Sequence, residues 1–418
     1  MRFLYILGAY KPKASANGIC SENIIEQLIK GGHSVTVISN AARGVPEYSV
    51  QPDGVEVYRV KQRLYLRLKE YGDAKSGSVI GKVVLSVAFC INKLQLFFTA
   101  ASWPVISYST VNRFKKAALK LCEKEKFDAV ISVYTPIESL LAGFEVKKKH
   151  PEIKFYPYFL DSLAFGYGPK YFGKEKTFSR GIAIEKKIFP SADKIILMKS
   201  SEDQQKKYNS EFSDKLCFLD IPMLKQCNTL QAKTVKSPDK IKLLFVGSIS
   251  SAVRNPSPLV SALAKTKNER LYCEFVGNID CPQKFETLKK AFGERLTFSA
   301  FMPHEQLCRK LNEADVLLNI GNLVSTMVPS KIFEYMSYGK PIISTYEIDN
   351  EPSAEYLRSY PCALLLDGRN APEENALKIE EFIENSVGKH TDFDELKKKF
   401  ILNTPEEFVR AIGENEND

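Results

Sequence analysis

The sequence predicts an α/β protein built from two doubly wound parallel-sheet domains. The chain has 418 residues, which is too long for a single hydrophobic core. Short apolar segments alternate with amphipathic segments in both halves, as in βαβ units. A polar stretch between residues 223 and 240 separates the two halves. We therefore expect an N-terminal domain over 1–222, a linker over 223–240, a C-terminal domain over 241–395, and C-terminal helices over 396–418 for which packing back on the N-terminal domain is one arrangement.

Composition and charge narrow the class of protein. Hydrophobic residues make up 44% and charged residues 26%, which is typical of a globular protein. The nine cysteines are odd in number, form no CxxC pair and are joined by only four histidines, so we expect reduced thiols in the cytoplasm and no structural metal site. Residues 1–225 contain 35 Lys and Arg against 22 Asp and Glu, whereas the remainder contains 24 against 28. The basic half predicts an anionic partner: a phosphorylated substrate, an anionic lipid or nucleic acid.

The first βαβ unit is predicted over residues 3–39. A buried strand over 3–8 is followed by a loop in which Asn17, Gly18 and other small residues would let a ligand approach the backbone. We expect a helix capped by Ser21 at its start and by glycines at its end, and then a second strand. The loop lacks GxGxxG, which argues against a dinucleotide-binding enzyme.

Two further features belong to the N-terminal half. The strand that begins at Lys154 ends in Asp161, at the strand end where open α/β sheets keep their ligands, although Asp161 could equally cap its loop. A basic, aromatic region over 52–75 precedes the least charged stretch, 83–112, which is too polar to predict a membrane span. It suits either a helix pair at a lipid surface, with Phe97, Phe98 and Trp103 in the interface and the preceding cations on anionic headgroups, or an ordinary buried helix pair.

The most informative stretch is VPSKIFEYMSYGKPIIS, residues 328–344. Pro329 and Ser330 predict a helix start, Gly339 the helix end, and the apolar run after it a buried strand. Ser330 and Lys331 at a helix N-terminus suit a phosphate, and Glu334 could accept hydrogen bonds from two ribose hydroxyls. The competing interpretation is an ordinary helix cap followed by an i,i+3 ion pair between Lys331 and Glu334.

Several segments together resemble a known family. They are VPSKIFEYMSYGKPIIS, FVGSIS, FMPHEQLCRKLNEADVLLNIG and EKKIFPSADKIILMKS, and they resemble bacterial glycosyltransferases of the GT-B fold in the family 4 group, of the polysaccharide-biosynthesis type. The likeness covers most of the chain, is clearest over 241–367 and is loosest over 40–120. It implies a C-terminal domain that binds a nucleotide-activated sugar, an N-terminal domain that binds the acceptor, and a cleft between the two.

The resemblance also implies roles for individual residues. Glu334 matches the glutamate on the ribose, Arg254 matches the cation that neutralises the diphosphate, and Thr326 stands where the family often has a first glutamate. The full set implied at the donor site is Asn17, Gly18, Gly247, Ser248, Arg254, Phe301, Ser330, Lys331 and Glu334. The expected catalytic residues are Asp161, as orienting group or base for the acceptor hydroxyl, and Arg254 and Lys331, as stabilisers of the leaving group.

The expected reaction transfers a sugar from a nucleotide sugar, a UDP-sugar first, to a glycan or a polyprenyl-diphosphate-linked acceptor in cell-surface polysaccharide synthesis. Family resemblance implies retention of configuration, and the cationic side chains predict metal-independent transfer with no cofactor beyond the substrate. We expect a cytoplasmic enzyme, for which a peripheral position on the inner face of the plasma membrane is one arrangement. Two alternatives stay open: a sugar-nucleotide epimerase of the same fold, and a non-catalytic protein that binds anions or nucleic acid.

Overall fold

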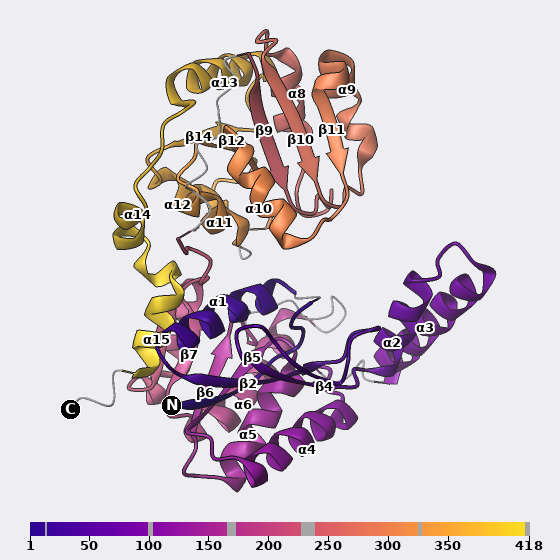
Figure 1. Cartoon of the computed structure of the whole chain (residues 1–418), viewed down its shortest axis with the longest axis vertical. Coiled ribbons are helices and arrows are strands. Elements are labelled where there is room, and N and C mark those ends of the chain that lie inside the picture. The colour runs from indigo at the N-terminus through magenta and orange to yellow at the C-terminus, as the bar shows by residue number, and fades with distance from the viewer. Residues whose placement is uncertain (13–14, 99–102, 165–172, 227–238, 325–327, 414–418) are drawn as a thin grey trace. The chain divides into compact units, whose positions relative to one another are not determined.

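The computed structural model describes residues 1–12, 15–98, 103–164, 173–226, 239–324 and 328–413. The chain divides into two compact units, which are described separately here: an N-terminal unit of residues 1–222 and 405–418, and a C-terminal unit of residues 223–404. Each unit is a mainly parallel sheet with helices on its faces (Figure 1). The prediction of two doubly wound α/β domains is therefore confirmed.

The N-terminal unit is organised around an eight-stranded sheet of order β3-β4-β2-β1-β5-β6-β7-β8. All its neighbouring strands are parallel except the β3–β4 pair. The strands are β1 (Arg2–Ile6), β2 (Ser34–Asn40), β3 (Tyr48–Val50), β4 (Glu56–Val60), β5 (Ala129–Tyr134), β6 (Lys154–Phe159), β7 (Ile195–Met198) and β8 (Leu216–Leu219). The helices are α1 (Ala16–Lys30), α2 (Leu64–Asp73), α3 (Val79–Phe98), α4 (Tyr108–Lys124), α5 (Ile137–Lys149), α6 (Lys174–Ile188), α7 (Glu202–Tyr208) and α15 (Pro405–Gly413).

The C-terminal unit contains a parallel six-stranded sheet of order β11-β10-β9-β12-β13-β14. Its central strand β12 is buried along its whole length, as expected for a strand covered on both faces. The strands are β9 (Ile241–Val246), β10 (Leu271–Val276), β11 (Leu296–Ser299), β12 (Val316–Ile320), β13 (Ile342–Tyr346) and β14 (Ala363–Asp367). The helices are α8 (Ser257–Lys265), α9 (Glu286–Phe292), α10 (His304–Glu313), α11 (Lys331–Ser337), α12 (Pro352–Arg358), α13 (Pro372–Ser386) and α14 (Phe393–Lys399).

The boundary between the C-terminal unit and the end of the chain lies one helix later than the sequence predicts. Helix α14 stays with the C-terminal unit, and the division falls after Thr404 rather than after residue 395. The last helix, α15, packs on the N-terminal unit: the Phe408 ring lies 4.9 Å from that of Tyr158, and the Lys194 ammonium donates to the Ala411 carbonyl. The two helices expected together over residues 396–418 therefore belong to different units, α14 to the C-terminal unit and α15 to the N-terminal unit.

The first helix begins a turn and a half earlier than the sequence predicts. Helix α1 starts at Ala16 because the Ser15 hydroxyl accepts a hydrogen bond from the Gly18 amide and caps it. Ser21, expected to be the cap, is fully buried inside the helix and donates to the Asn17 carbonyl. Asn17 and Gly18 thus lie in the first helical turn and not in an open loop.

Candidate active site

A glycine turn follows strand β9 at its carboxyl end, where parallel sheets bind ligands. Gly247 has a φ of +148°, which favours glycine. Its carbonyl oxygen lies so close to Gly277 that a Cβ there would meet it at 2.0 Å. The turns after β9 and β10 therefore pack against each other through two glycines. Gly247 was expected from the sequence, whereas Gly277 was not, since nothing in its local sequence indicates this contact.

Arg254 lies beside this turn, and neutral acceptors orient it. Its Nε donates to the Asn322 side-chain oxygen at 2.8 Å, and its Nη1 donates to the Ser248 carbonyl at 3.2 Å. Burial lowers the pKa of the guanidinium. Within the described part of the chain no carboxylate forms a salt bridge with Arg254. Its charge is thus held in place by dipoles and can interact with an anionic ligand.

Asn322 is itself fixed by a buried carboxylate that the sequence analysis did not identify. Glu351 is only 2% exposed and accepts hydrogen bonds from the Asn322 amide at 2.9 Å and from the Ala354 amide at 2.8 Å, the latter at the start of α12. A chain of contacts therefore runs from Glu351 through Asn322 to Arg254. The signal in the sequence was the position of Asn322 just after β12, at the same edge of the sheet as Gly247.

Helix α11 is anchored next to the glycine turn by Tyr335. The buried Tyr335 hydroxyl accepts from the Val246 amide at 2.8 Å and donates to the Val246 carbonyl at 3.2 Å, and burial raises the pKa of this hydroxyl. Gly339, with a φ of +64°, ends the segment before β13, as the sequence predicts. The helix that carries Lys331 and Glu334 is thus tied to the end of β9.

The two charged residues of α11 contact each other. Lys331 and Glu334 form an i,i+3 ion pair, and Glu334 is 8% exposed. This ion pair is the arrangement expected if Lys331 and Glu334 have only a structural role. A role of Glu334 in binding ribose would require Lys331 to share or release the carboxylate. Ser330 occupies the cap position, but its side chain makes no capping hydrogen bond there. The expected place of Ser330 at the helix start is therefore confirmed, but a capping hydrogen bond from its side chain is absent.

The remaining donor-side residues lie at the edges of the described structure. Phe301, in the loop between β11 and α10, is 68% exposed. Ser248 supplies its carbonyl to Arg254, as described above. Thr326, at the position where a first glutamate was expected, lies outside the described residues.

In the N-terminal unit, the structure brings together two residues that the sequence analysis assigned to different substrates. The Asn17 side chain donates to the Asp161 carboxylate at 3.1 Å, and its distance to the Thr135 hydroxyl is 3.4 Å. Asp161 is exposed just beyond β6, and Thr135 follows β5, so the cluster lies at the carboxyl edge of this sheet. Gly18 is buried behind it in α1 and does not contribute a side chain.

Buried contacts from α6 fix the loop that carries Asp161. The carboxylate of the fully buried Glu185 accepts from the Ala164 amide at 3.2 Å and from the Asn209 side chain at 2.9 Å. Burial raises its pKa to about 7. At Gly181 a Cβ would meet the Ala164 Cα at 2.4 Å, so helix and loop touch closely. The sequence analysis identified neither residue.

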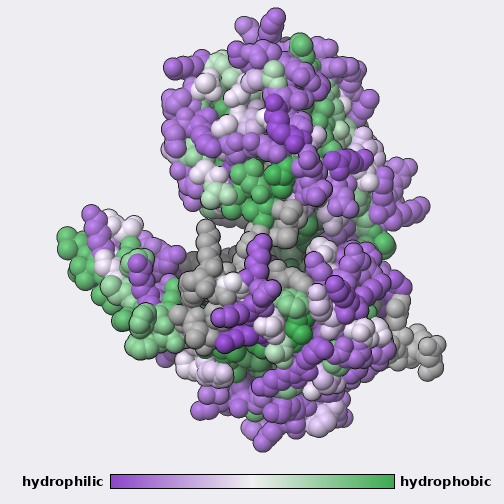
Figure 2. Space-filling model, turned by 180° about the vertical axis from the view of Figure 1, so that it is seen from behind, coloured by the Kyte–Doolittle hydropathy of each residue, from purple (hydrophilic) through white to green (hydrophobic). Residues whose placement is uncertain are grey.

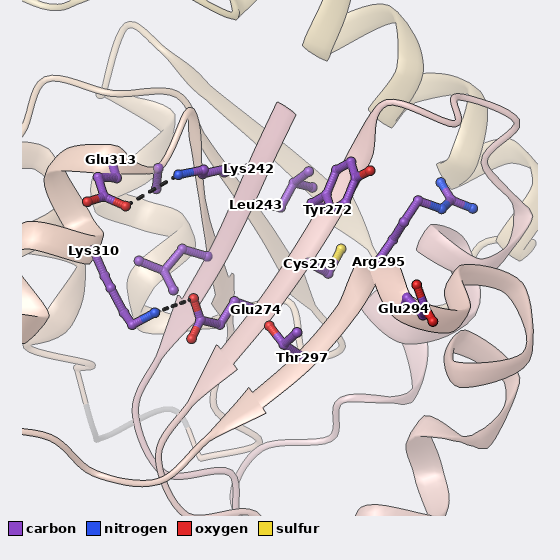
Figure 3. Close-up of a pocket in the computed structure, with 12 residues that line it drawn as sticks. Lys242, Leu243, Tyr272, Cys273, Glu274, Glu294, Arg295, Thr297, Lys310 and Glu313 are labelled. Atoms are coloured by element: carbon purple, nitrogen blue, oxygen red, sulfur yellow. Dashed lines mark hydrogen bonds and ion pairs between the residues drawn. The ribbon is translucent and has the colours of Figure 1, made fainter. Parts of the chain in front are cut away.

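A separate open pocket of about 200 Å³ lies on the face of β9, β10 and β11 (Figure 3). Its two lysines are paired, Lys310 with Glu274 at 2.8 Å and Lys242 with Glu313 at 3.3 Å, and Arg295 donates to backbone carbonyls. Lys242 and Tyr272 lie near the amino ends of their strands, away from the carboxyl edge that holds Gly247. None of the expected donor-site residues lines this pocket. Among the described residues, no group of three or more His, Cys, Asp or Glu side chains is placed so that it could hold a metal ion.

Comparison with known proteins gives a family match for the C-terminal unit and a fold match for the whole chain. The family model of glycosyl transferases group 1 matches residues 228–405. No curated protein sequence gave a match.

Three solved structures illustrate the fold match. A glycosyltransferase from Rickettsia africae is 14% identical with a TM-score of 0.63, and the match covers 100% of this chain and 99% of that one. An E. coli protein described as trehalose-6-phosphate bound with UDP-2-fluoro glucose is 10% identical with a TM-score of 0.59, covering 98% of each chain. Anabaena HepE in complex with UDP and glucose is 12% identical with a TM-score of 0.53, covering 98% of this chain and 94% of that one.

Identities this low indicate the shared fold alone, and the family match adds the activity class. Residues 228–405 include Gly247, Arg254, Lys331 and Glu334, the residues around which the donor side was built above. The chain is a glycosyltransferase of the GT-B fold, with a group 1 glycosyl transferase domain over residues 228–405.

Proposed function

We propose that this enzyme transfers a sugar from a UDP-sugar to a glycan or polyprenyl-diphosphate-linked acceptor, with retention of configuration and without a metal ion. The observation that carries the proposal is the position and orientation of the Arg254 guanidinium. This guanidinium is half-buried, is oriented by Asn322 and the Ser248 carbonyl, and lies beside the Gly247 turn. The lack of a side chain at Gly247 would let a phosphate approach the backbone there. Two UDP-containing structures of the same fold, from E. coli and Anabaena, support UDP as the nucleotide.

The chemistry follows from where charge develops. The acceptor hydroxyl attacks the anomeric carbon while the bond from that carbon to the phosphate oxygen breaks, and its electron pair moves to the departing diphosphate. Arg254 and Lys331 would stabilise this anion, which is the work that a divalent cation does in other transferases. Glu334 would accept from the ribose hydroxyls, which requires Lys331 to turn from the carboxylate to the phosphate.

On the acceptor side, Asp161 is the proposed orienting group. Its carboxylate is exposed at the carboxyl edge of the N-terminal sheet and already accepts a hydrogen bond from Asn17. Asn17 thus acts in this proposal as a partner of Asp161, although it was first assigned to the donor. An acceptor hydroxyl that binds to Asp161 could lose its proton to that carboxylate or to the departing phosphate oxygen. A polyprenyl-linked acceptor would place the enzyme in the cytoplasm, at the inner face of the plasma membrane.

The proposal is tested by measuring release of UDP from a panel of UDP-sugars in EDTA, with a membrane lipid extract as acceptor. We expect wild type to release UDP and Arg254→Gln to lower kcat by about 100-fold or more, with a smaller change in KM for the donor, because the guanidinium acts mainly on the developing charge. The matched control, Arg358→Gln, removes a cation at the end of α12 and should leave kcat unchanged. Equal rates in wild type and Arg254→Gln would contradict the role of Arg254. Accumulation of an isomeric nucleotide sugar without UDP release would favour the epimerase.

A further inference from the structure

Helix α3 is an apolar helix whose surface is mostly uncovered. Among the described residues, Val79–Phe98 is the one helix long and apolar enough to cross a membrane, and only 11% of that apolar stretch is buried. In Figure 1, α2 and α3 form a hairpin that extends away from the sheet of the N-terminal unit. The expectation of an ordinary buried helix pair is therefore wrong.

The two helices pack closely along one side of α3 only. A Cβ at Gly72 of α2 would meet the Leu85 side chain at 2.6 Å, and a Cβ at Gly81 would meet the Lys75 carbonyl at 1.9 Å. Gly81 and Ala88 are the residues of α3 that are buried. The glycines thus allow the hairpin to close, and the opposite side of α3 stays open to solvent.

The open side presents large apolar side chains. Val83, Val87 and Leu94 are spaced four and seven residues apart, so they form one stripe, and Phe97 and Phe98 at its end are 76% and 80% exposed. The exposed apolar residues of α3 are Val79, Ile80, Val83, Val87, Phe89, Leu94, Leu96, Phe97 and Phe98. In Figure 2 apolar side chains gather on the projecting hairpin beside hydrophilic ones. A stable soluble surface would rarely keep such a patch without a partner.

Cations border this apolar stripe. Residues 61–98 contain seven Lys and Arg against two Asp and Glu. The exposed cations are Lys61, Arg67, Lys69, Lys75, Lys82 and Lys93. Arg63 is not among them, because it pairs with the buried Glu138 and donates to the Val105 carbonyl at 2.8 Å. Trp103, also expected at a lipid surface, is half-buried with a buried indole nitrogen, so Phe97 and Phe98 are the exposed aromatic residues.

We propose that the α2–α3 hairpin docks the enzyme on the surface of an anionic lipid bilayer, with α3 lying in the interface. The apolar stripe would enter the acyl boundary, and the bordering lysines would contact acidic headgroups. This proposal deepens the proposed function by naming a lipid bilayer as the partner of the acceptor-binding unit. Its biological purpose, access to a lipid-linked acceptor, rests on the proposed function, whereas the docking itself does not.

Charge argues for a lipid surface over a second copy of the chain, and for an interfacial helix over a spanning one. Two hairpins that each carry an excess of cations would repel each other at a shared face. A spanning orientation would bring α2 into the hydrocarbon with Arg67, Lys69 and Asp73, where charged side chains are strongly unfavourable. An interfacial position leaves all of these charges in the headgroup layer.

The test is co-sedimentation of the full chain, without nucleotide, with vesicles of phosphatidylcholine or of phosphatidylcholine and phosphatidylglycerol at 7:3, in low and high salt. We expect binding to the anionic vesicles that falls with salt. Lys82→Gln with Lys93→Gln should weaken it about 25-fold, at about fivefold for each lysine. Val87→Asp with Leu94→Asp should abolish it. The matched control, Lys187→Gln with Lys207→Gln on α6 and α7, removes the same charge elsewhere in this unit and should change binding by less than about twofold.

Several outcomes would overturn the proposal. They are absence of wild-type binding, equal binding to neutral and anionic vesicles, and equal weakening by the control pair. Dissociation of an oligomer by Val87→Asp with Leu94→Asp, in a protein that does not bind vesicles, would identify a second copy as the occupant. Circular dichroism of each variant should match wild type, since all six substituted positions are exposed. Because no nucleotide is present, failure here leaves the UDP-release result standing and the two proposals stay distinguishable.

Discussion

At the scale of single residues, buried polar groups hold the candidate site residues in place. Asn322 and Glu351 orient Arg254, and Glu185 holds the loop that carries Asp161. In each case the candidate residue could be proposed from the sequence, because its chemistry and its place after a strand are local features. The buried carboxylates Glu351 and Glu185 could not, since their contacts join segments 29 and 21 residues apart and leave no short motif.

Glu185 gives a prediction for the pH dependence of stability. Its folded pKa of about 7 lies above the ordinary value of 4.5 for a glutamate, so the folded protein binds the proton more tightly than the unfolded chain. The contribution of Glu185 to the free energy of unfolding is therefore greatest below the unfolded pKa. It declines as the pH rises towards 7, by about 3 kcal/mol in all. Glu185→Gln imitates the neutral acid and should flatten this decline. Urea unfolding of both proteins between pH 5 and pH 8 checks it, and an unchanged difference between them across that range would refute the assignment.

At the scale of elements, the sequence prediction succeeded at helix ends that depend on local residues and failed at those that depend on other contacts. The end of α11 and the start of β13 were predicted because Gly339 and Pro341 act locally. The start of α1 was misplaced because Ser15 and Ser21 are both good caps, and only the hydrogen bond from the Gly18 amide to Ser15 distinguishes them. The exposure of α3 could not be decided from sequence either, since an apolar helix suits a core as well as a lipid surface.

Lys340 provides a prediction at this scale. It is 5% exposed, and its ammonium donates to the carbonyls of Leu311, Asn312 and Ala314 at the end of α10. Lys340→Met would remove this charged donor from the three carbonyls, and we expect a loss of about 2–4 kcal/mol in the free energy of unfolding. Lys378→Met, which removes an exposed i,i+4 ion pair on α13, should cost less than about 0.5 kcal/mol. Equal losses in the two variants by urea unfolding would show that Lys340 is not a cap.

At the scale of the whole molecule, the two-domain α/β architecture could be predicted because parallel strands read as apolar runs and the length excludes one core. The candidate site could be predicted from the sequence only in part. Gly247, Arg254 and the segment that carries Lys331 and Glu334 do converge on the carboxyl edge of one sheet, through Tyr335 and the glycine turn. The pairing of Asn17 with Asp161 depends on the order of β1, β5 and β6 in the sheet, which no local pattern fixes.

The most direct test of the account is calorimetric titration of wild type, Glu334→Ala and Glu381→Ala with UDP, GDP, ADP and CMP, without metal. Glu381 is an exposed carboxylate on α13 and serves as the matched control. We predict selective binding of UDP that is weakened about 10- to 100-fold in Glu334→Ala, from the loss of charged hydrogen bonds to ribose, and is unchanged in Glu381→Ala. Binding of no nucleotide, or equal UDP affinity in a folded Glu334→Ala, would contradict a donor site at this helix and leave Lys331 and Glu334 as a structural ion pair.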